Sequence, residues 1–301
     1  MTSSVAQTPS WRDYLLLIFL SALWGASFML IKVAVQTIPA VPMTTLRLIV
    51  AAIVMVIVAM ASGEKLPRGV GIWIKIAVVA VLGNAVPFGL ISWGEESVDS
   101  GLAAIMMAIM PLTTLLLAHV FTTDEKLNRW KLAGVLLGLV GLIILMGPEK
   151  LMSLGDNVIH QLAIALAAIF YGISTLVVKF IKDVPARALT AAILVLSALS
   201  ILPVTLLTVD VANLSPSVPS IIATITLGVF QTALAGLLAY FIIRKLGATF
   251  FSQLNFMVPL FGVFFGIVFL GEEVGLHAIL ALVVILTGIS LARYGIDRFS
   301  K

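Results

Sequence analysis

Residues 24–32 read WGASFMLIK, and residues 171–179 read YGISTLVVK. An aromatic residue, a glycine, a serine and a lysine recur at the same spacing. Two further echoes follow in the same order: Val41-Pro42 returns as Val184-Pro185, and Pro111 with Glu125 returns as Pro259 with Glu273. Recurrence at about half the chain length indicates an internal repeat. The sequence therefore predicts two related halves, 12–147 and 159–294, joined by the polar linker 148–158.

The composition places this chain in lipid. Hydrophobic residues make up 61% of its 301 residues and charged residues only 11%, whereas about a quarter of a soluble domain is charged. The absence of cysteine excludes disulfides and thiolate metal sites, and we expect no cofactor and no metal. The Lys and Arg residues are scattered through short loops, which argues against a nucleic-acid partner. The expected partners are the lipid bilayer and a small-molecule substrate.

Ten stretches are suited to cross a bilayer, which takes about 20 mostly apolar residues in a helix. They are 14–37, 42–62, 71–94, 100–122, 130–147, 159–181, 186–208, 217–243, 247–270 and 276–294. The sequence thus predicts an all-α integral membrane protein with ten transmembrane helices.

The placement of positive charge predicts the topology, because cytoplasmic loops are enriched in Lys and Arg. With a cytoplasmic N-terminus and alternating segments, 15 of the 18 Lys and Arg residues fall on the cytoplasmic side, and both termini are cytoplasmic. Five segments per half is an odd number, so the second half enters from the opposite side. Inverted repeats are typical of secondary transporters that bind substrate near the bilayer midplane. We therefore expect alternating access through a central cavity.

The few polar and aromatic residues at mid-depth are the candidates for a solute site. Trp24 and Tyr171 are repeat mates, and aromatic residues otherwise favour the membrane interfaces. The competing interpretation is that the Ser, Asn and Gln side chains join packed helices and that Met107 is ordinary packing. The candidate substrate-binding residues are Trp24, Ser27, Asn84, Met107, Tyr171, Ser174, Gln231 and Asn255.

Three prolines fall inside predicted segments: Pro87, Pro111 and Pro259. Each frees the carbonyl group four residues earlier, and lipid tolerates this only where protein or a wet cavity satisfies it. We interpret them as helix breaks beside a central cavity. The alternative is a plain kink.

Two cations lie inside the predicted segments. Arg47, near the outer end of its segment, is placed to draw an anionic group such as a carboxylate into an outer vestibule, and its repeat mate Thr190 is uncharged. Lys32 is a second vestibule charge, or its side chain extends to the nearer membrane interface.

All 14 acidic residues lie in loops or at segment ends. This placement argues against ion coupling through an intramembrane carboxylate and favours a neutral or zwitterionic solute.

Gly134, Gly138 and Gly141 form a small-residue face on segment 130–147. Such a face lets helix backbones approach closely. We interpret this segment, and its mate 276–294, as scaffold or as the contact of a homodimer. On the first segment we expect Leu17 to face lipid.

Enzyme signatures are missing from the sequence. It has neither the G-x-x-x-x-G-K-[ST] phosphate loop nor H-E-x-x-H, and we expect no enzymatic activity. A channel and an intramembrane hydrolase are the rival classes, and the hydrolase would need a serine beside a mid-depth His or Lys.

The chain resembles the EamA-domain type of the drug/metabolite transporter superfamily, on Trp24-Gly25-x-Ser27-Phe28 with Lys32, Arg47, Pro111 with Glu125, Pro259, Gly271-Glu272-Glu273 and Gly288. The resemblance implies export from the cytoplasm across a bacterial inner membrane. It also implies a cavity formed by the first four segments of each half. Within the superfamily the chain resembles the YddG-like exporters of aromatic and other neutral amino acids. Other small metabolites or drugs are the alternative substrates.

Overall fold

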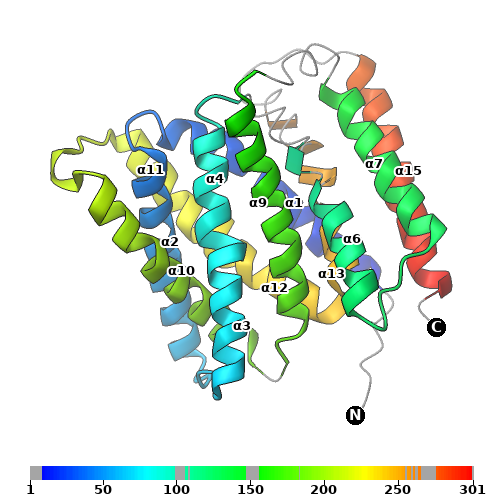
Figure 1. The fold of residues 1–301 in the computed structure, drawn as a ribbon, viewed down its shortest axis with the longest axis horizontal. Helices are drawn as coiled ribbons and strands as arrows, with labels where there is room; N and C mark the ends of the chain where they lie inside the picture. Colours follow the sequence, from blue (N-terminus) through cyan, green and yellow to red (C-terminus); the bar gives the residue numbers. More distant parts are fainter. Residues whose placement is uncertain are drawn as a thin grey trace.

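The computed structural model describes residues 9–98, 106–107, 109–146, 156–182, 184–254, 256–258, 260–261, 264–265 and 276–299. Within these residues all regular structure is helical, with no strand. The long uninterrupted helices are α1 (Trp11–Ala34), α2 (Ala40–Ala61), α6 (Ile109–Phe121), α7 (Arg129–Met146), α9 (Val158–Lys179), α10 (Ala186–Thr208) and α15 (Leu276–Phe299). Figure 1 shows them as a bundle of roughly parallel and antiparallel rods.

Two further spans contain a π-helical segment, whose turns are wider than those of an α-helix. The first consists of α3 (Val70–Ala80), η1 (Val81–Ala85) and α4 (Val86–Gly94). The second consists of α11 (Val218–Thr226), η3 (Leu227–Leu234) and α12 (Ala235–Leu246), followed by the short helix α13 (Ala248–Ser252). The π segments occupy corresponding places in the two halves, although the sequence pattern did not indicate them.

Six helical runs in the described residues are long and apolar enough to cross a membrane, and shorter apolar helices accompany them. The predicted all-α membrane fold is confirmed. Predicted and observed bounds differ most at the end of α15, which runs to Phe299 and not to the expected residue 294. α1 begins at Trp11, three residues before the expected start, because Ser10 caps it: the Ser10 N–H and hydroxyl donate to the Asp13 carboxylate at 2.9 and 2.7 Å. Of the segment expected at 100–122, the structure describes residues 106–107 and 109–122.

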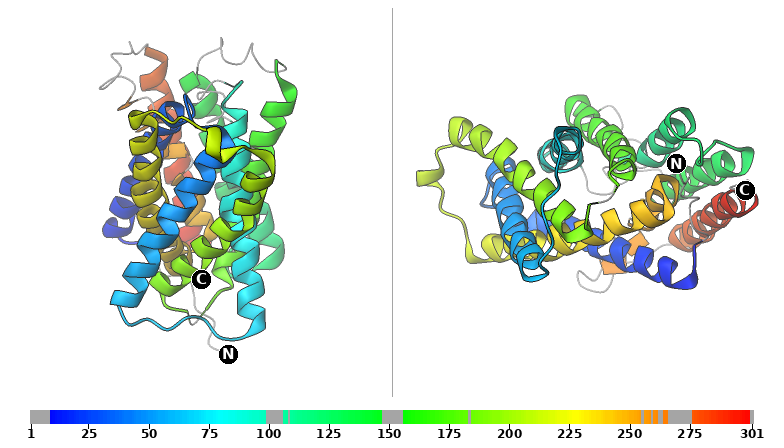
Figure 2. Two further views of the ribbon diagram at one scale, coloured as in Figure 1. Left: turned by 90° about the vertical axis from the view of Figure 1, so that its left-hand side faces the viewer. Right: turned by 90° about the horizontal axis from the view of Figure 1, so that it is seen from below.

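The packing of the helices is symmetric between the halves. Three pairs join helices that occupy the same place in each half: α2 with α10, α6 with α13, and α7 with α15. Several other contacts come in exchanged pairs: α1 packs on α11–α12 while α9 packs on α3–α4, and α2 packs on η3 while α10 packs on η1. Figure 2 shows the two halves interleaved rather than side by side. This pattern is that of two inverted repeats.

The helix starts refine which residues correspond. Pro39 and Pro185 are the N-caps of α2 and α10. The structural counterpart of Pro185 is therefore Pro39, whereas the sequence analysis paired Pro185 with Pro42, three residues further along the chain. The equivalent of Arg47 is then Ile193 and not Thr190, because the same offset applies along both helices.

The start of α1 and the end of α15 lie at the same end of the bundle (Figure 1). Ion pairs tie helices together at this end. Lys245 Nζ lies 2.6 Å from Asp13 Oδ1, and Arg187 Nη1 lies 3.1 Å from Glu64 Oε1. Acidic and basic residues from both halves therefore meet here.

One expected lipid contact is wrong. Leu17 is 0% exposed and belongs to the largest buried cluster, together with Phe250 and Phe251. Neighbours surround α1 on more sides than its sequence indicates, since it is apolar all round. On the same helix Phe19, at 49% exposure, faces outward.

The glycine face of α7 is covered by α15 of the same chain. A Cβ atom on Gly134 would lie 2.5 Å from the carbonyl oxygen of Gly288, and one on Gly141 would lie 2.5 Å from the Ile285 side chain. The glycines therefore permit a close backbone approach within the chain. A homodimer through α7 and α15 stays a prediction, and it would use the outward faces of these helices.

Candidate solute-binding cavity

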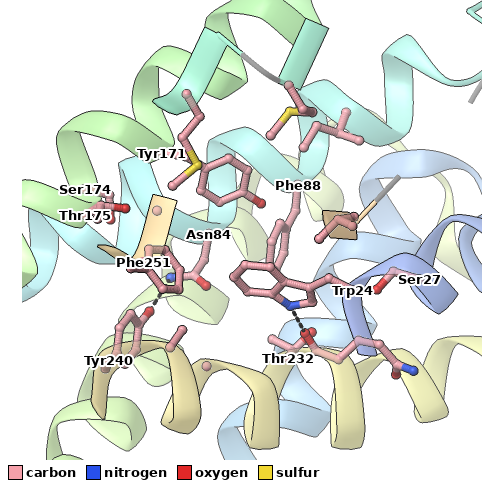
Figure 3. Close-up of a pocket in the computed structure, with 18 of the residues that line it drawn as sticks. Trp24, Ser27, Asn84, Phe88, Tyr171, Ser174, Thr175, Thr232, Tyr240 and Phe251 are labelled. Carbon is pink, nitrogen blue, oxygen red and sulfur yellow. Dashed lines mark hydrogen bonds between the residues drawn. The ribbon is translucent and has the colours of Figure 1, made fainter. Parts of the chain in front are cut away.

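A cavity of about 130 Å³ lies between the two halves. Its wall comes from α1, α2, α6, α9, α13 and both π-containing spans. An engineered cavity of about 150 Å³ takes up benzene, so this space suits an apolar group the size of an aromatic ring. Figure 3 shows aromatic and polar side chains converging on it.

Seven of the eight candidate substrate-binding residues line this cavity: Trp24, Ser27, Asn84, Met107, Tyr171, Ser174 and Gln231. The eighth, Asn255, lies outside the described residues. Arg47, which we expected in an outer vestibule, lines the same cavity. The repeat motif thus contributes an aromatic residue and a serine from each half to one space.

Pro87, Pro111 and Lys32 are not among the residues that line the cavity. Pro87 opens α4 directly after η1, and Pro111 is buried in the first turn of α6. Lys32 lies in the last turn of α1 and is exposed. Pro259 is outside the described part of the chain. Pro87 still bears on the cavity, because it fixes the exit from the π segment that carries Asn84.

Two aromatic pairs shape the wall. The indole N–H of Trp24 donates to the backbone carbonyl of Gln231 at 3.0 Å, and its ring meets Phe251 edge-on at 6.0 Å between centroids. Across the cavity Tyr171 packs against Phe88 at 6.3 Å. Within the described residues the Tyr171 hydroxyl has no hydrogen-bond partner, and it is directed toward the middle of the pocket in Figure 3. Trp24 is therefore anchored, whereas Tyr171 offers a hydroxyl to a solute.

Each π segment presents one polar side chain that bonds to the carbonyl five residues earlier. Asn84 Nδ2 donates to Val79 O at 3.4 Å, and Thr232 Oγ1 donates to Leu227 O at 2.9 Å. Asn84 also donates to the Tyr240 hydroxyl at 3.2 Å. Because π segments are frequent at functional sites, their place at this cavity agrees with a binding role for both spans.

Arg47 is the charged residue in the wall. It is 4% exposed, its Nε donates to Thr232 Oγ1 at 2.6 Å, and its guanidinium carbon lies 4.1 Å above the centre of the Phe88 ring. The Thr232 bond ties α2 to η3, and the ring contact ties α2 to α4. The guanidinium is thereby fixed in orientation from both halves of the chain.

The wall residues that the sequence analysis missed include Phe88, Thr232, Tyr240 and Phe251. Phenylalanine is common in apolar helices, so Phe88 and Phe251 carry no distinctive signal. Thr232 was detectable, because it follows Asn84 by the 148 residues that separate the starts of the two π-containing spans.

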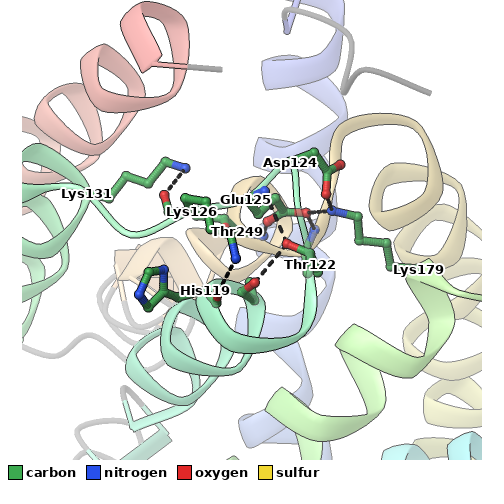
Figure 4. Close-up of polar contacts among 10 residues, drawn as sticks. His119, Thr122, Asp124, Glu125, Lys126, Lys131, Lys179 and Thr249 are labelled. Atoms are coloured by element: carbon green, nitrogen blue, oxygen red, sulfur yellow. Dashed lines mark hydrogen bonds and ion pairs between the residues drawn. The ribbon is translucent and has the colours of Figure 1, made fainter. Parts of the chain in front are cut away.

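A polar cluster (Figure 4) joins helices at the end of the bundle where α1 starts and α15 ends (Figure 1). The Glu125 carboxylate accepts from Lys179 Nζ at 2.5 Å and from the backbone N–H groups of Ala248 and Thr249 at 3.0 and 2.7 Å. Lys179 Nζ also lies 2.7 Å from Asp124 Oδ1. Burial alone would raise the pKa of Asp124, but the hydrogen bond and charge of Lys179 hold that pKa below its usual range. The cluster joins the ends of α6 and α9 to the start of α13.

Gly247 makes room for this cluster. Its φ of +93° suits glycine, and a Cβ atom there would lie 2.4 Å from Glu125 Oε1. Lys32 and Glu273 are the repeat counterparts of Lys179 and Glu125. Lys32 has no ion-pair partner within the described residues, and Glu273 lies outside them.

Two interleaved inverted repeats around a solute-sized cavity define a class: a multi-pass membrane transporter of small molecules. The chain belongs to the EamA-like transporter family, whose family model matches residues 12–147 and 159–294.

The chain is similar to several bacterial proteins over nearly its whole length. It is 23% identical to the uncharacterized transporter YoaV of Bacillus subtilis, over 94% of this chain and 97% of that protein. It is 28% identical to Protein PagO of Salmonella typhimurium, over 92% of this chain and 91% of that protein. It is 25% identical to the uncharacterized inner membrane transporter YedA of Escherichia coli, over 91% and 88%. A crystal structure with 19% identity superposes with a TM-score of 0.77, covering 95% of this chain and 99% of that one, which shows the fold alone.

Proposed function

We propose that this transporter exports small neutral or zwitterionic metabolites, foremost amino acids with apolar side chains, by alternating access through the central cavity. The observation that carries the proposal is the composition of the wall. Trp24, Phe88 and Phe251 offer apolar surface, which favours burial of a solute by about 25 cal/mol per Å². Asn84 and Tyr171 offer the few polar groups that orient a ligand in such pockets.

The wall favours a carrier over the hydrolase. Serines line the cavity at Ser27, Ser92 and Ser174, but the described lining residues include no His or Lys to activate them. We also propose that the end carrying the termini and the Glu125 cluster faces the cytoplasm, because the loops rich in Lys and Arg lie there. Labelling of a cysteine introduced at Lys126 with an impermeant reagent, from each side in turn, tests this sidedness.

Counterflow in liposomes tests the proposed function. The purified protein should give saturable uptake of labelled phenylalanine or leucine, and preloading the liposomes with the unlabelled solute should accelerate it. These results reflect a binding site that faces one side at a time. Flux that rises linearly with concentration would instead indicate a channel. Hydrolysis of a peptide or lipid ester without flux would indicate the enzyme.

A further inference from the structure

Arg47 holds a buried positive charge without a fixed counter-ion. Thr232 takes the Nε donor and Phe88 covers one face of the guanidinium. The two Nη groups have no hydrogen-bond partner within the described residues, and no carboxylate there lies within ion-pair distance of Arg47. The charge of Glu95 acts on Arg47, but no ion pair joins them.

A buried guanidinium without a counter-ion destabilises the folded protein unless a ligand supplies the missing negative charge. Arginine remains protonated in proteins, and a charge removed from water is stabilised only by a well-placed partner. The equivalent position on α10 holds the fully buried Ile193, so the other half packs at this place without a cation. The free edge of the guanidinium is therefore available to an anion in the cavity.

The geometry selects a planar anion. The Thr232 bond and the Phe88 stack fix the plane of the guanidinium, which leaves the Nη donors in a fork. Such a fork pairs in bidentate fashion with a carboxylate. By contrast, no Asp or Glu is among the described residues that line the cavity, so an ammonium group finds no charged partner in the described wall.

We infer that the cavity contains a carboxylate subsite at Arg47, and that solutes are recognised by a carboxylate joined to an apolar body, with the ammonium group dispensable. This rests on the proposed function and redefines its substrate class. The substrate class becomes monocarboxylates with an aromatic or aliphatic body, of which apolar amino acids are one part. The carboxylate meets Arg47, and the apolar body lies against the aromatic wall of Trp24 and Tyr171.

Direct binding to the purified full-length protein tests this subsite independently of transport. The probes share one ring and differ in charge: 3-phenylpropanoate, phenylalanine and phenethylamine. We expect 3-phenylpropanoate to bind within about threefold of phenylalanine, and phenethylamine to bind about tenfold or more weakly, since hydrogen bonds to charged groups are strong. Phenethylamine binding as tight as 3-phenylpropanoate, or tighter, would overturn the inference. The comparison uses the unaltered protein, so it does not depend on the folding of a variant.

Substitution of Arg47 locates the effect. Arg47→Gln should weaken the binding of 3-phenylpropanoate about tenfold or more. It should leave the binding of the uncharged 3-phenylpropanamide unchanged. Arg68→Gln, which removes an exposed loop charge, should change neither. Unchanged 3-phenylpropanoate binding in Arg47→Gln would also overturn the subsite. If carboxylates bind through Arg47 but are never transported, the proposed function fails and the subsite stands; if phenylalanine is transported but Arg47→Gln binds and transports it like the unaltered protein, the subsite alone fails.

Discussion

Replacing Glu125 by Gln should destabilise the protein more than any other single change at the end of the bundle where α1 starts and α15 ends. The carboxylate is bonded to Lys179 and to two backbone N–H groups at the start of α13. Its side chain is 6% exposed and that of Lys179 is 15% exposed. Removing one partner of a buried ion pair costs about 3 kcal/mol or more, and the amide of Gln cannot accept all three bonds with one oxygen.

The adjacent residue provides a matched control. Asp124 also pairs with Lys179, but its side chain is 31% exposed and it accepts no bond from α13. Asp124→Asn should therefore cost about 1 kcal/mol or less. Thermal unfolding of the two variants in the same detergent measures the difference. A midpoint for Glu125→Gln as high as that for Asp124→Asn would contradict the role given to the cluster.

Replacing Trp24 by Ala should impair transport about tenfold or more, because the change removes a large part of the aromatic wall and 1.4 kcal/mol corresponds to tenfold. It also leaves the Gln231 carbonyl without its indole donor. Tyr171→Ala should act in the same direction, and Tyr171→Phe should separate the hydroxyl from the ring. Transport efficiency in liposomes, corrected for the amount of folded protein, is the measurement.

The control for Trp24 must face lipid. Phe19→Ala fits, because Phe19 lies on the same helix and is half-exposed, and it should leave transport and stability unchanged. Leu17→Ala does not serve, since it opens a cavity in the core and should cost about 2 kcal/mol or more of stability. Wild-type transport rates in both Trp24→Ala and Tyr171→Ala would place the solute site elsewhere.

The sequence was most informative where a polar or repeated aromatic residue interrupts an otherwise apolar segment. Asn84 and Gln231 stand out in apolar segments, and the recurrence of Trp24 as Tyr171 marked both helices at once. These residues do meet in one cavity. The recurrence also predicted the inverted packing, because an odd number of segments per half leaves no other arrangement.

Other features depend on geometry that a linear pattern does not record. A π turn rotates the residues after it relative to an α-helix, so the inward directions of Thr232 on η3 and of Tyr240 on the following α12 could not be read from helical periodicity. Leu17 was misplaced because α1 is apolar all round. Arg47 was expected in a vestibule because its distance from the helix end suggested one, whereas the neighbouring Phe88 and Thr232 hold it in the cavity wall.

Solute protection of a cavity cysteine tests the central claim most directly, and the chain offers a cysteine-free background. Ser27→Cys places a thiol in the cavity wall with little change in size, and Ser62→Cys places one at the exposed end of α2. If the cavity binds the transported solute, saturating phenylalanine should slow methanethiosulfonate labelling of Cys at position 27 by about tenfold and leave position 62 unaffected. Equal labelling rates at position 27 with and without a solute that the protein transports would contradict the account.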